Sequence, residues 1–534
     1  MKNDAFSKTS NTEMVTISRA EYDADKTYIS ELEAQNRWLM EQLKLLKKRS
    51  FGTSSEKTSD EVYEQLSLLF NEAEVTVDME EAEGSEAAKA PEVEVKAHSR
   101  TRKSGNVRDI VPNDIPVEVV EHRLPDVELA CPQCGTQMTV IGKEVRETLV
   151  FKPAEAYIRQ DVYYSYACQN CKENASSTPV VQTPKEPALI PGGYASPEAV
   201  AHTVVQKFVM GSPLYRQEKE WNAVGIMLSR QTMSNWLVRC ATDWCKPIFD
   251  VLRQLLIHEH DLLHADETEL QVLHEPGRAP QTKSYMWLYR TSGDAEHPIV
   301  LYDYQPGRGQ EYPNAFLEGY HGYLQTDGYS GYNGLPDVIH VGCFAHCRRK
   351  FEEARQALPK GKRSPTAEEG VAFCTKLFQL EAQFKDLSPT ERKQKRLEQE
   401  KPVLDAMFAW AKTRNAAPKS KLGIALTYLK NQKPNLTAYL LDGRIEISNN
   451  RAERSIKPFV ISRKNFLFSN TPSGAESSAV LFSLIETAKE NGLDPFRYLT
   501  WVFSEAPQRS LTDPGWARSL LPQNAPIRCK AIPT

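Results

Sequence analysis

The sequence predicts a multidomain protein built around an α/β core, a mixed sheet flanked by helices and interrupted by a helical insertion. Three observations favour this fold class: an N-terminal heptad pattern, two Cys-x-x-Cys pairs, and short apolar segments after residue 260 that give way to helical patterns. A chain of 534 residues with 40% hydrophobic residues is long enough for several domains. We expect these to be a tail and coiled coil (1–59), an acidic linker and basic patch (60–108), a zinc-binding domain (109–190), a helix-turn-helix region (191–250), the first part of the core (251–365), the insertion (366–441), the second part of the core (442–470) and a C-terminal helical region (471–534).

The coiled coil is predicted from apolar residues at heptad spacing. One core position holds Ile29, Asn36 and Leu43, and the other holds Leu32, Leu39 and Leu46. An asparagine at a core position favours a defined register and two strands, so we expect a homodimer or a larger assembly through this segment. The alternative is a single amphipathic helix packed on the protein.

Charge is unevenly distributed along the chain, although the formal net charge is only −4. Residues 60–96 contain 12 Asp and Glu and two Lys, so the rest of the chain is net positive and compatible with a DNA partner. The acidic stretch indicates a flexible linker, and the basic residues 98–108 are either a solvated tail or a binding element. Without a bilayer-length apolar run or a signal-peptide core, we expect a cytoplasmic, nucleoid-associated protein with no membrane partner.

The zinc-binding domain is predicted from Cys131, Cys134, Cys168 and Cys171, with 33 residues between the two pairs. Two Cys-x-x-Cys pairs bring four thiolates to one tetrahedral Zn²⁺ ion. Because all four ligands come from the protein, one structural zinc is expected. Redox-active thiols are the alternative.

A helix-turn-helix segment is predicted over residues 212–241, with a turn at Gly225 and a second helix capped by Ser229. The second helix would offer Arg230, Gln231, Ser234 and Asn235 to a DNA groove. An ordinary helical hairpin with Trp236 and Leu237 in the core is the alternative.

The core is expected to begin with strands at 261–273, 284–291 and 298–304. A helix over 310–318 should precede a strand over 322–327, and residues 337–355 indicate a fifth strand running into a helix. The 125 residues between Asp327 and Glu453 are too many for one connection, so we expect a helical insertion over 366–441. Beyond residue 472, one helix should stop at Asn491–Gly492, another should start at Asp494–Pro495, and an irregular tail should follow from Ser504.

Three acidic residues are candidates for a magnesium site. Asp266 shares a strand face with His264 and Thr268, and Asp327 ends a short strand at a Gly-rich turn. Glu453 lies in a predicted helix. Oxygen ligands from strand ends and a helix suit two hard divalent cations. Glu446 is the nearest rival to Glu453, and His264 is expected to be a core or site-edge residue.

The helix that carries Glu453 is expected to be capped by Ser448, with Asn449 and Asn450 on the face of Glu453. Pro458 should kink or stop it. The basic residues around it are expected to meet a polyanion such as DNA; they are Arg451, Arg454, Lys457, Arg463 and Lys464.

Residues 343–350 contain thiols, a histidine and three cations. Cys343, His346 and Cys347 offer only three ligands with no partner cluster, so packing of the thiols as small apolar groups is favoured over a second metal site. Arg348, Arg349 and Lys350 are expected to meet DNA phosphate or to form a solvated face.

At these positions the chain resembles the insertion sequence 66 family of DDE transposases. The matching pieces are HADET at Asp266, LQTDGYSGYN at Asp327, HVGCFAHCRRKF at 340–351 and NNRAERSIKPFVISRKNFLFS at 449–469. The resemblance implies a ribonuclease-H-like catalytic core, dependence on Mg²⁺, and the catalytic triad Asp266, Asp327 and Glu453. It also implies a zinc-binding domain that helps grip the element ends, and accessory transposition proteins as partners.

The leading hypothesis is therefore a DNA transposase that cuts double-stranded DNA at the ends of a mobile element and joins the ends to target DNA. In it, Asp266 and Asp327 bridge two Mg²⁺ ions and Glu453 completes the shell of the second. Two alternatives remain open: a zinc-dependent DNA-binding or repressor protein with an inactive core, and a structure-selective nuclease of the same fold.

Overall fold

The computed structural model of the chain describes Lys26 and residues 159–162, 164–167, 180–182, 185–358 and 362–532. The predictions of the coiled coil, the acidic linker, the basic patch and the ligands Cys131, Cys134, Cys168 and Cys171 lie outside these residues. The chain divides into two compact units, residues 87–185 and residues 1–86 together with 186–534, and each is described by itself.

In the unit 87–185, the described residues include two short antiparallel strands, β1 (Ser165–Ala167) and β2 (Val180–Gln182). Tyr166 lies opposite Val181 in their register. The candidate ligands Cys168 and Cys171 fall between these two strands in the sequence.

The larger unit is organised around one five-stranded mixed sheet, as predicted. Its strands are β3 (Leu262–Gln271), β4 (Lys283–Thr291), β5 (Val300–Gln305), β6 (Gly322–Gln325) and β7 (Val338–Val341), in the spatial order β5-β4-β3-β6-β7. The three strands β3, β4 and β5 form an antiparallel meander, whereas β6 and β7 run parallel to β3. Helix α9 (Glu311–Phe316) connects β5 to β6 and confirms the predicted helix. The central strand β3 thus has an antiparallel neighbour on one side and a parallel one on the other.

One hydrophobic core joins the sheet to helices from both ends of this unit. These helices are α5 (Pro197–Phe208), α8 (Lys246–Glu259), α16 (Asn450–Phe466), α17 (Pro472–Glu490) and α18 (Pro495–Thr512). Helix α17 covers the edge strand β5, because Ser483 Oγ accepts from the Tyr302 N–H (2.8 Å) and Thr487 Oγ1 accepts from the Val300 N–H (3.0 Å). Two side chains of α17 therefore satisfy backbone donors that an exposed edge would leave open.

The C-terminal prediction is right at its start and wrong at its end. Helix α17 stops before Gly492, which has φ +71°, and the Asp494 carboxylate accepts from the Arg497 N–H at the start of α18. The tail is not irregular from Ser504, because α18 continues through Pro507 to Thr512. Its buried side chains pack into the core and outweigh the donor that proline removes. Helix α19 (Trp516–Ser519) and two 3₁₀ turns, η7 (Pro522–Asn524) and η8 (Ile527–Cys529), follow.

The two helices and the turn predicted for the helix-turn-helix segment are present as α6 (Leu214–Ala223) and α7 (Arg230–Cys240). Gly225 turns the chain with φ +81°, and the Ser229 side chain accepts from the Thr232 N–H at 3.1 Å. Trp236 and Leu237 are buried in the core. A π-helical turn, η3 (Ala241–Cys245), links α7 to α8.

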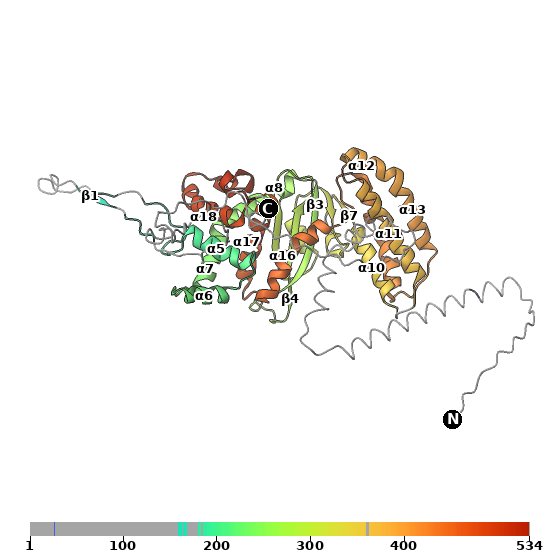
Figure 1. The fold of residues 1–534 in the computed structure, drawn as a ribbon, viewed down its shortest axis with the longest axis horizontal. Coiled ribbons are helices and arrows are strands. Elements are labelled where there is room, and N and C mark those ends of the chain that lie inside the picture. The colour runs from blue at the N-terminus through green and yellow to red at the C-terminus, as the bar shows by residue number, and fades with distance from the viewer. Residues whose placement is uncertain are drawn as a thin grey trace, which may run out of the picture. The chain divides into compact units, whose positions relative to one another are not determined.

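The predicted insertion is helical and has a hydrophobic core of its own, which continues into β7 and α10 (Phe344–Gln356). Its elements lie beyond the β7 edge of the sheet (Figure 1): α11 (Pro365–Gln383), α12 (Pro389–Lys395), η5 (Arg396–Glu400), α13 (Lys401–Lys412), α14 (Lys421–Asn431), α15 (Lys433–Thr437) and η6 (Ala438–Leu441). Among the helices of the described residues, none combines the length and apolar character that crossing a bilayer requires.

Helix α16, which packs on β3 and β4, departs from the prediction at its cap and does not stop at Pro458, where a kink or a stop was expected. Its N-cap is Asn449 rather than Ser448, and the helix runs through Pro458 to Phe466. A proline leaves the preceding turn short of a backbone donor. Here the Tyr302 hydroxyl on β5 donates to the Ser455 carbonyl, and Arg290 donates to the Ser455 hydroxyl. The sheet therefore anchors the turn that precedes Pro458, and the helix does not stop there.

Candidate active site

Asp266 and Asp327 come together through the parallel pairing of β3 with β6. The register pairs Leu263 with Leu324 and His264 with Gln325. Extended by two residues, it sets Asp266 opposite Asp327, and adjacent strands lie about 4.8 Å apart. Asp327 follows the end of β6 in a turn closed by its own side chain, because Oδ1 accepts from the Tyr329 N–H at 2.8 Å. The two acids therefore share one edge of the sheet.

Glu453 reaches this edge from the first turn of α16, where it is 7% exposed. Asn449, the cap residue, fastens that turn to β3. Its Nδ2 donates to the Ala265 carbonyl at 2.8 Å, and its Oδ1 lies 2.9 Å from His264 Nδ1. Because the Ala265 contact fixes the orientation of the amide, His264 is the donor to Oδ1. Residues flanking Asp266 in sequence thus set the start of the helix that carries Glu453.

The charges of the three carboxylates act on one another. The pKa of Asp266 is raised well above its usual value, first by burial and then by the negative charges of Glu267, Asp327 and Glu453. The pKa of Glu453 is also raised by burial and by Asp327, while Arg349 opposes the shift. Clustered acids that disfavour one another's ionisation are stabilised by a bound cation. The structure therefore brings the three predicted acids into one electrostatic cluster.

The donor set fits a hard divalent cation. All three groups are carboxylates, the ligand type that Mg²⁺ prefers. Glu453 Oε1 is buried and has no hydrogen-bond partner among the described residues, so it is available to a ligand. Asp266 and Asp327 each use Oδ1 for a local backbone N–H, which fixes the orientation of the carboxylate. Asp266, Asp327 and Glu453 are therefore the residues that would hold Mg²⁺.

Two neighbours of the cluster were missed by the sequence reasoning. Glu267 accepts from Arg308 Nε (2.8 Å) and the Tyr332 hydroxyl (2.7 Å), and its pKa is raised by burial and by Asp327. The Tyr428 hydroxyl of α14 donates to the Asp327 carbonyl at 2.9 Å. The Asp-Glu pair of HADET was a signal for Glu267, whereas nothing local in sequence linked Tyr428 to Asp327.

The start of α10 lies beside Glu453. Potential ligand atoms of Cys343, His346 and Glu453 all lie within 4.8 Å of one another. Cys347, by contrast, is buried against Cys374 of the insertion, which agrees with the expected packing of thiols. The histidine and one thiol of this motif thus adjoin the acidic cluster, a proximity that the sequence reasoning did not anticipate.

Comparison with known proteins identifies the family of this part of the chain. Residues 192–477, which include the sheet, the insertion and all three acids, match the profile described as "Transposase IS66 family". The chain belongs to the IS66 transposase family.

Three further IS66-related profiles match other parts of the chain. They are described as "Transposase C of IS166 homeodomain" (residues 38–120), "zinc-finger binding domain of transposase IS66" (128–172) and "IS66 C-terminal element" (483–515). The zinc-finger match spans all four predicted cysteine ligands and supports zinc binding.

Two similar proteins come from Sinorhizobium fredii (strain NBRC 101917 / NGR234). "Uncharacterized protein y4hP" is 30% identical over 488 residues, covering 88% of this chain and 85% of that protein. "Uncharacterized protein y4qI" is 30% identical over 510 residues, covering 90% and 88%. Similarity to these relatives therefore extends over most of the chain.

In this IS66 chain, the rival acid Glu446 has another partner. Its carboxylate accepts from Arg451 at 2.6 Å. Burial acts to raise the pKa of Glu446, but His264 and Arg451 hold it below the usual value. Glu446 is thus neutralised by a close guanidinium, whereas Arg349 lies 3.4 Å from Glu453 Oε2 and leaves Glu453 Oε1 without a hydrogen bond.

The cations expected to meet DNA are placed differently from one another. On α16, Arg454 and Lys464 are exposed, Arg463 donates to a threonine hydroxyl of β3 at 3.4 Å, and Arg451 pairs with Glu446. On α7, Arg230, Gln231 and Asn235 are exposed and Ser234 is half-buried, so this face is open to a partner.

On α10, the expectation of a shared cationic face does not hold for Arg348. It is 6% exposed and its Nε donates to Thr375 of the insertion at 3.4 Å, because its position on the helix faces the insertion core. Arg349 turns to Glu453, with 3.4 Å between Nη2 and Oε2. Lys350 lies over the Tyr428 ring, 4.8 Å from the centroid.

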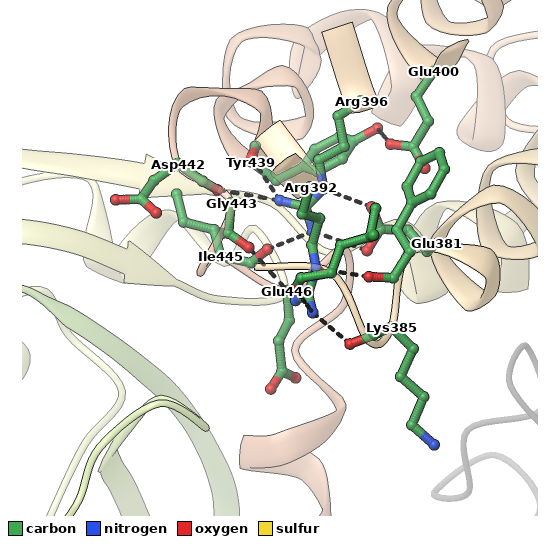
Figure 2. Close-up of polar contacts among 12 residues, drawn as sticks. Glu381, Lys385, Arg392, Arg396, Glu400, Tyr439, Asp442, Gly443, Ile445 and Glu446 are labelled. Carbon is green, nitrogen blue, oxygen red and sulfur yellow. Dashed lines mark hydrogen bonds and ion pairs between the residues drawn. The ribbon is translucent and has the colours of Figure 1, made fainter. Parts of the chain in front are cut away.

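The insertion is tied to the segment that leads into α16 by two arginines (Figure 2). Arg396, fully buried, forms an ion pair with Glu381 (2.6 Å) and donates to the carbonyls of Tyr439 (3.1 Å), Asp442 (3.1 Å) and Ile445 (2.8 Å). Arg392 donates to the Lys385 carbonyl at 2.8 Å and to the Gly443 carbonyl at 3.5 Å. The insertion thereby fixes the path of residues 439–445 just before Glu453.

Proposed function

We propose that this IS66-family chain is a DNA transposase that cleaves mobile-element ends and transfers the freed 3′ ends to target DNA by two-metal-ion chemistry. The observation that carries the proposal is the convergence of Asp266, Asp327 and Glu453 from β3, the end of β6 and α16. The strand order β5-β4-β3-β6-β7, with an antiparallel meander followed by two parallel strands, supports the ribonuclease-H-like core implied by the resemblance.

The three carboxylates have distinct positions in this mechanism. Asp266 and Asp327, paired across β3 and β6, would hold the Mg²⁺ ions, and Glu453 would add a further carboxylate ligand. When bound, Mg²⁺ activates a water or a DNA 3′-hydroxyl and neutralises charge at the phosphate during in-line attack. The chain orients its acids with backbone N–H groups and with Asn449.

DNA is held by other parts of the protein in this proposal. The open face of α7, with Arg230, Gln231, Ser234 and Asn235, contacts a groove. Arg454, Arg463, Lys464 and Lys350 contact phosphates near the acids. One structural Zn²⁺ ion in the zinc-finger region shapes a contact with the element ends, and the N-terminal coiled coil brings two copies together, one for each end.

The test is a strand-transfer assay with labelled element ends, target plasmid and Mg²⁺. Asp266→Asn, Asp327→Asn and Glu453→Gln should each reduce cleavage and joining about a thousandfold or more, equivalent to about 4 kcal/mol, while end binding persists. Glu446→Gln is the matched control and should retain activity. Full activity of Glu453→Gln would remove its assignment.

The same assay separates the other functions. End-specific binding without cleavage in Mg²⁺ or Mn²⁺ would identify a zinc-dependent DNA-binding protein with an inactive core. Cleavage without joining, indifferent to the terminal sequence, would identify a structure-selective nuclease.

A further inference from the structure

The motif Cys343-x-x-His346-x-x-Arg349 at the start of α10 makes polar contacts to both oxygens of the Glu453 carboxylate. Arg349 Nη2 donates to Oε2 at 3.4 Å, and His346 Nδ1 lies 3.5 Å from Oε1. His346 and Arg349 also contact each other, with 3.3 Å between Arg349 Nη1 and His346 Nε2. One carboxylate is thus enclosed by two side chains that lie one turn apart on one helix.

The contact between Arg349 and His346 fixes where the histidine proton lies. An arginine side chain has only donors, so His346 Nε2 must offer its lone pair to Arg349. A neutral imidazole then carries its proton on Nδ1, the nitrogen that faces Glu453 Oε1. Nδ1 and Oε1 are both buried and lie 3.5 Å apart, and neither makes a hydrogen bond within the described residues. A small closing of this gap would pair the donor with the acceptor.

Cys343 acts on the backbone of the same site. Its Sγ accepts from the Asn449 N–H at 3.1 Å, and the next residue, Phe344, donates its N–H to the Ile447 carbonyl at 3.1 Å. These contacts join the start of α10 to the segment that caps α16. The thiol thus helps to set the position of the first helical turn, while His346 and Arg349 set the orientation of the carboxylate in that turn.

A zinc site made of Cys343, His346 and Glu453 is the competing interpretation. Zinc on His346 Nδ1 would require the proton on Nε2, where it would face the Arg349 donors. It would also replace the thiol contact to Asn449 and occupy the carboxylate that completes the acidic cluster. The existing contacts therefore favour a hydrogen-bonded clamp over a metal.

We propose that Cys343, His346 and Arg349 are positioning residues that hold Glu453 in the orientation needed to bind its cation. This inference rests on the proposed function, because it assigns Glu453 to a metal. Partners in the outer shell of a metal typically contribute 10- to 100-fold to metal affinity. Loss of the His346 and Arg349 contacts to Glu453 should therefore raise the metal concentration that DNA cleavage requires. The affinity for DNA ends should not change.

Two replacements of His346 distinguish the nitrogen atoms. The amide nitrogen of His346→Asn reaches the Nδ1 position and retains the donor to Oε1, whereas the amide of His346→Gln extends towards the Nε2 position. We expect His346→Asn to stay within about threefold of wild type in Mn²⁺ affinity, and His346→Gln and Arg349→Gln to weaken Mn²⁺ binding at least about tenfold. Arg355→Gln is the control, because Arg355 lies on the same helix but pairs with Glu352.

Mn²⁺ affinity is measured on the full-length protein by electron paramagnetic resonance, and the Mg²⁺ dependence of cleavage is measured in parallel. Equal Mn²⁺ affinity for wild type, His346→Gln and Arg349→Gln would overturn the clamp. So would a second zinc per chain, found by metal analysis in wild type and absent from Cys343→Ser. If wild type binds Mn²⁺ but cleaves no DNA, the proposed function fails, and the clamp still stands or falls on the Mn²⁺ affinities. If wild type binds no Mn²⁺, both fail.

Discussion

At the residue scale, local rules indicated the candidate acids, which the structure brings together, but not the residues that orient them. Side-chain alternation and strand ends predicted Asp266 and Asp327, because these rules involve only near neighbours in sequence. Asn449 was expected on the helical face of Glu453, yet it caps the helix, since its side chain binds strand residues 184 and 185 positions earlier. A cap chosen by long-range contacts cannot be read from a local pattern.

Replacing Asn449 tests this tie between strand and helix. Asn449→Ala would leave the Ala265 carbonyl and the buried His264 Nδ1 without partners, and each unsatisfied buried group costs about 1–3 kcal/mol. We expect a loss of at least about 2 kcal/mol in urea unfolding, together with reduced strand transfer. Asn435→Ala, which removes a contact to the half-buried Gln432, should cost less than about 1 kcal/mol and leave activity intact. Equal losses of stability and activity in Asn449→Ala and Asn435→Ala would show that the contacts of Asn449 to β3 are not needed to hold the helix.

Asp303 on β5 should make stability depend on pH. Burial raises the pKa of this carboxyl to about 6, although a hydrogen bond from Gln305 opposes the shift. The folded state therefore favours the protonated acid, and the associated stability is present below about pH 4 and lost as the pH rises through about 6. Across that interval the free energy of unfolding of Asp303→Asn should rise relative to that of wild type, by at most about 3 kcal/mol. Unfolding midpoints at pH 4, 5, 6 and 7 would test this, and a constant difference would contradict it.

At the element scale, the sequence predicted the strands and most helices, but it misjudged two prolines. Pro458 was expected to kink or stop its helix, and the tail from Ser504, which contains Pro507, was expected to be irregular; proline does disfavour helix in an isolated segment. Both lie in helices packed into the core, where buried side chains hold the element together. Before Pro458, a hydroxyl from β5 also anchors the helix through the Ser455 carbonyl, and that partner lies 153 residues away in sequence.

The support under Pro458 can be measured with a double-mutant cycle. Tyr302→Phe removes the hydroxyl that donates to the Ser455 carbonyl and should cost about 1–2 kcal/mol. The cost should shrink in a Pro458→Ala background, because the restored N–H can bond the Arg454 carbonyl and hold the same turn without the anchor. Urea unfolding of the four proteins gives the coupling energy. Additive effects would show that the hydroxyl does not compensate for the proline.

At the scale of the whole molecule, the sequence separated the insertion from the core but did not show how the two are joined. The helical pattern over 366–441 was sufficient to predict helices, because amphipathic spacing is local. Arg392 and Arg396 connect the insertion to the core by donating to backbone carbonyls of residues 439–445 (Figure 2). Because every residue has a backbone carbonyl, such contacts leave no pattern of side chains in the sequence. The insertion is therefore a structural part of the site, not an appendage.

Arg396→Met should show this dependence. It would leave Glu381 and three carbonyls buried without their donor, so we expect a loss of about 3–5 kcal/mol and weaker strand transfer. Arg414→Met is the control, because its ion pair with Glu369 is exposed and should contribute less than about 1 kcal/mol. Stability and strand transfer are measured for both. Wild-type transfer by a destabilised Arg396→Met protein would separate the insertion from the site.

The distance along the chain between Asp327 and Glu453, 125 residues, has a consequence for biosynthesis. A ribosome releases the first two acids well before the third, so a nascent polypeptide lacks the complete acidic cluster until the insertion has formed and α16 has docked on β3. Under the proposed mechanism, translation products that end early would therefore be unable to nick DNA, although they contain the sheet that bears two of the acids.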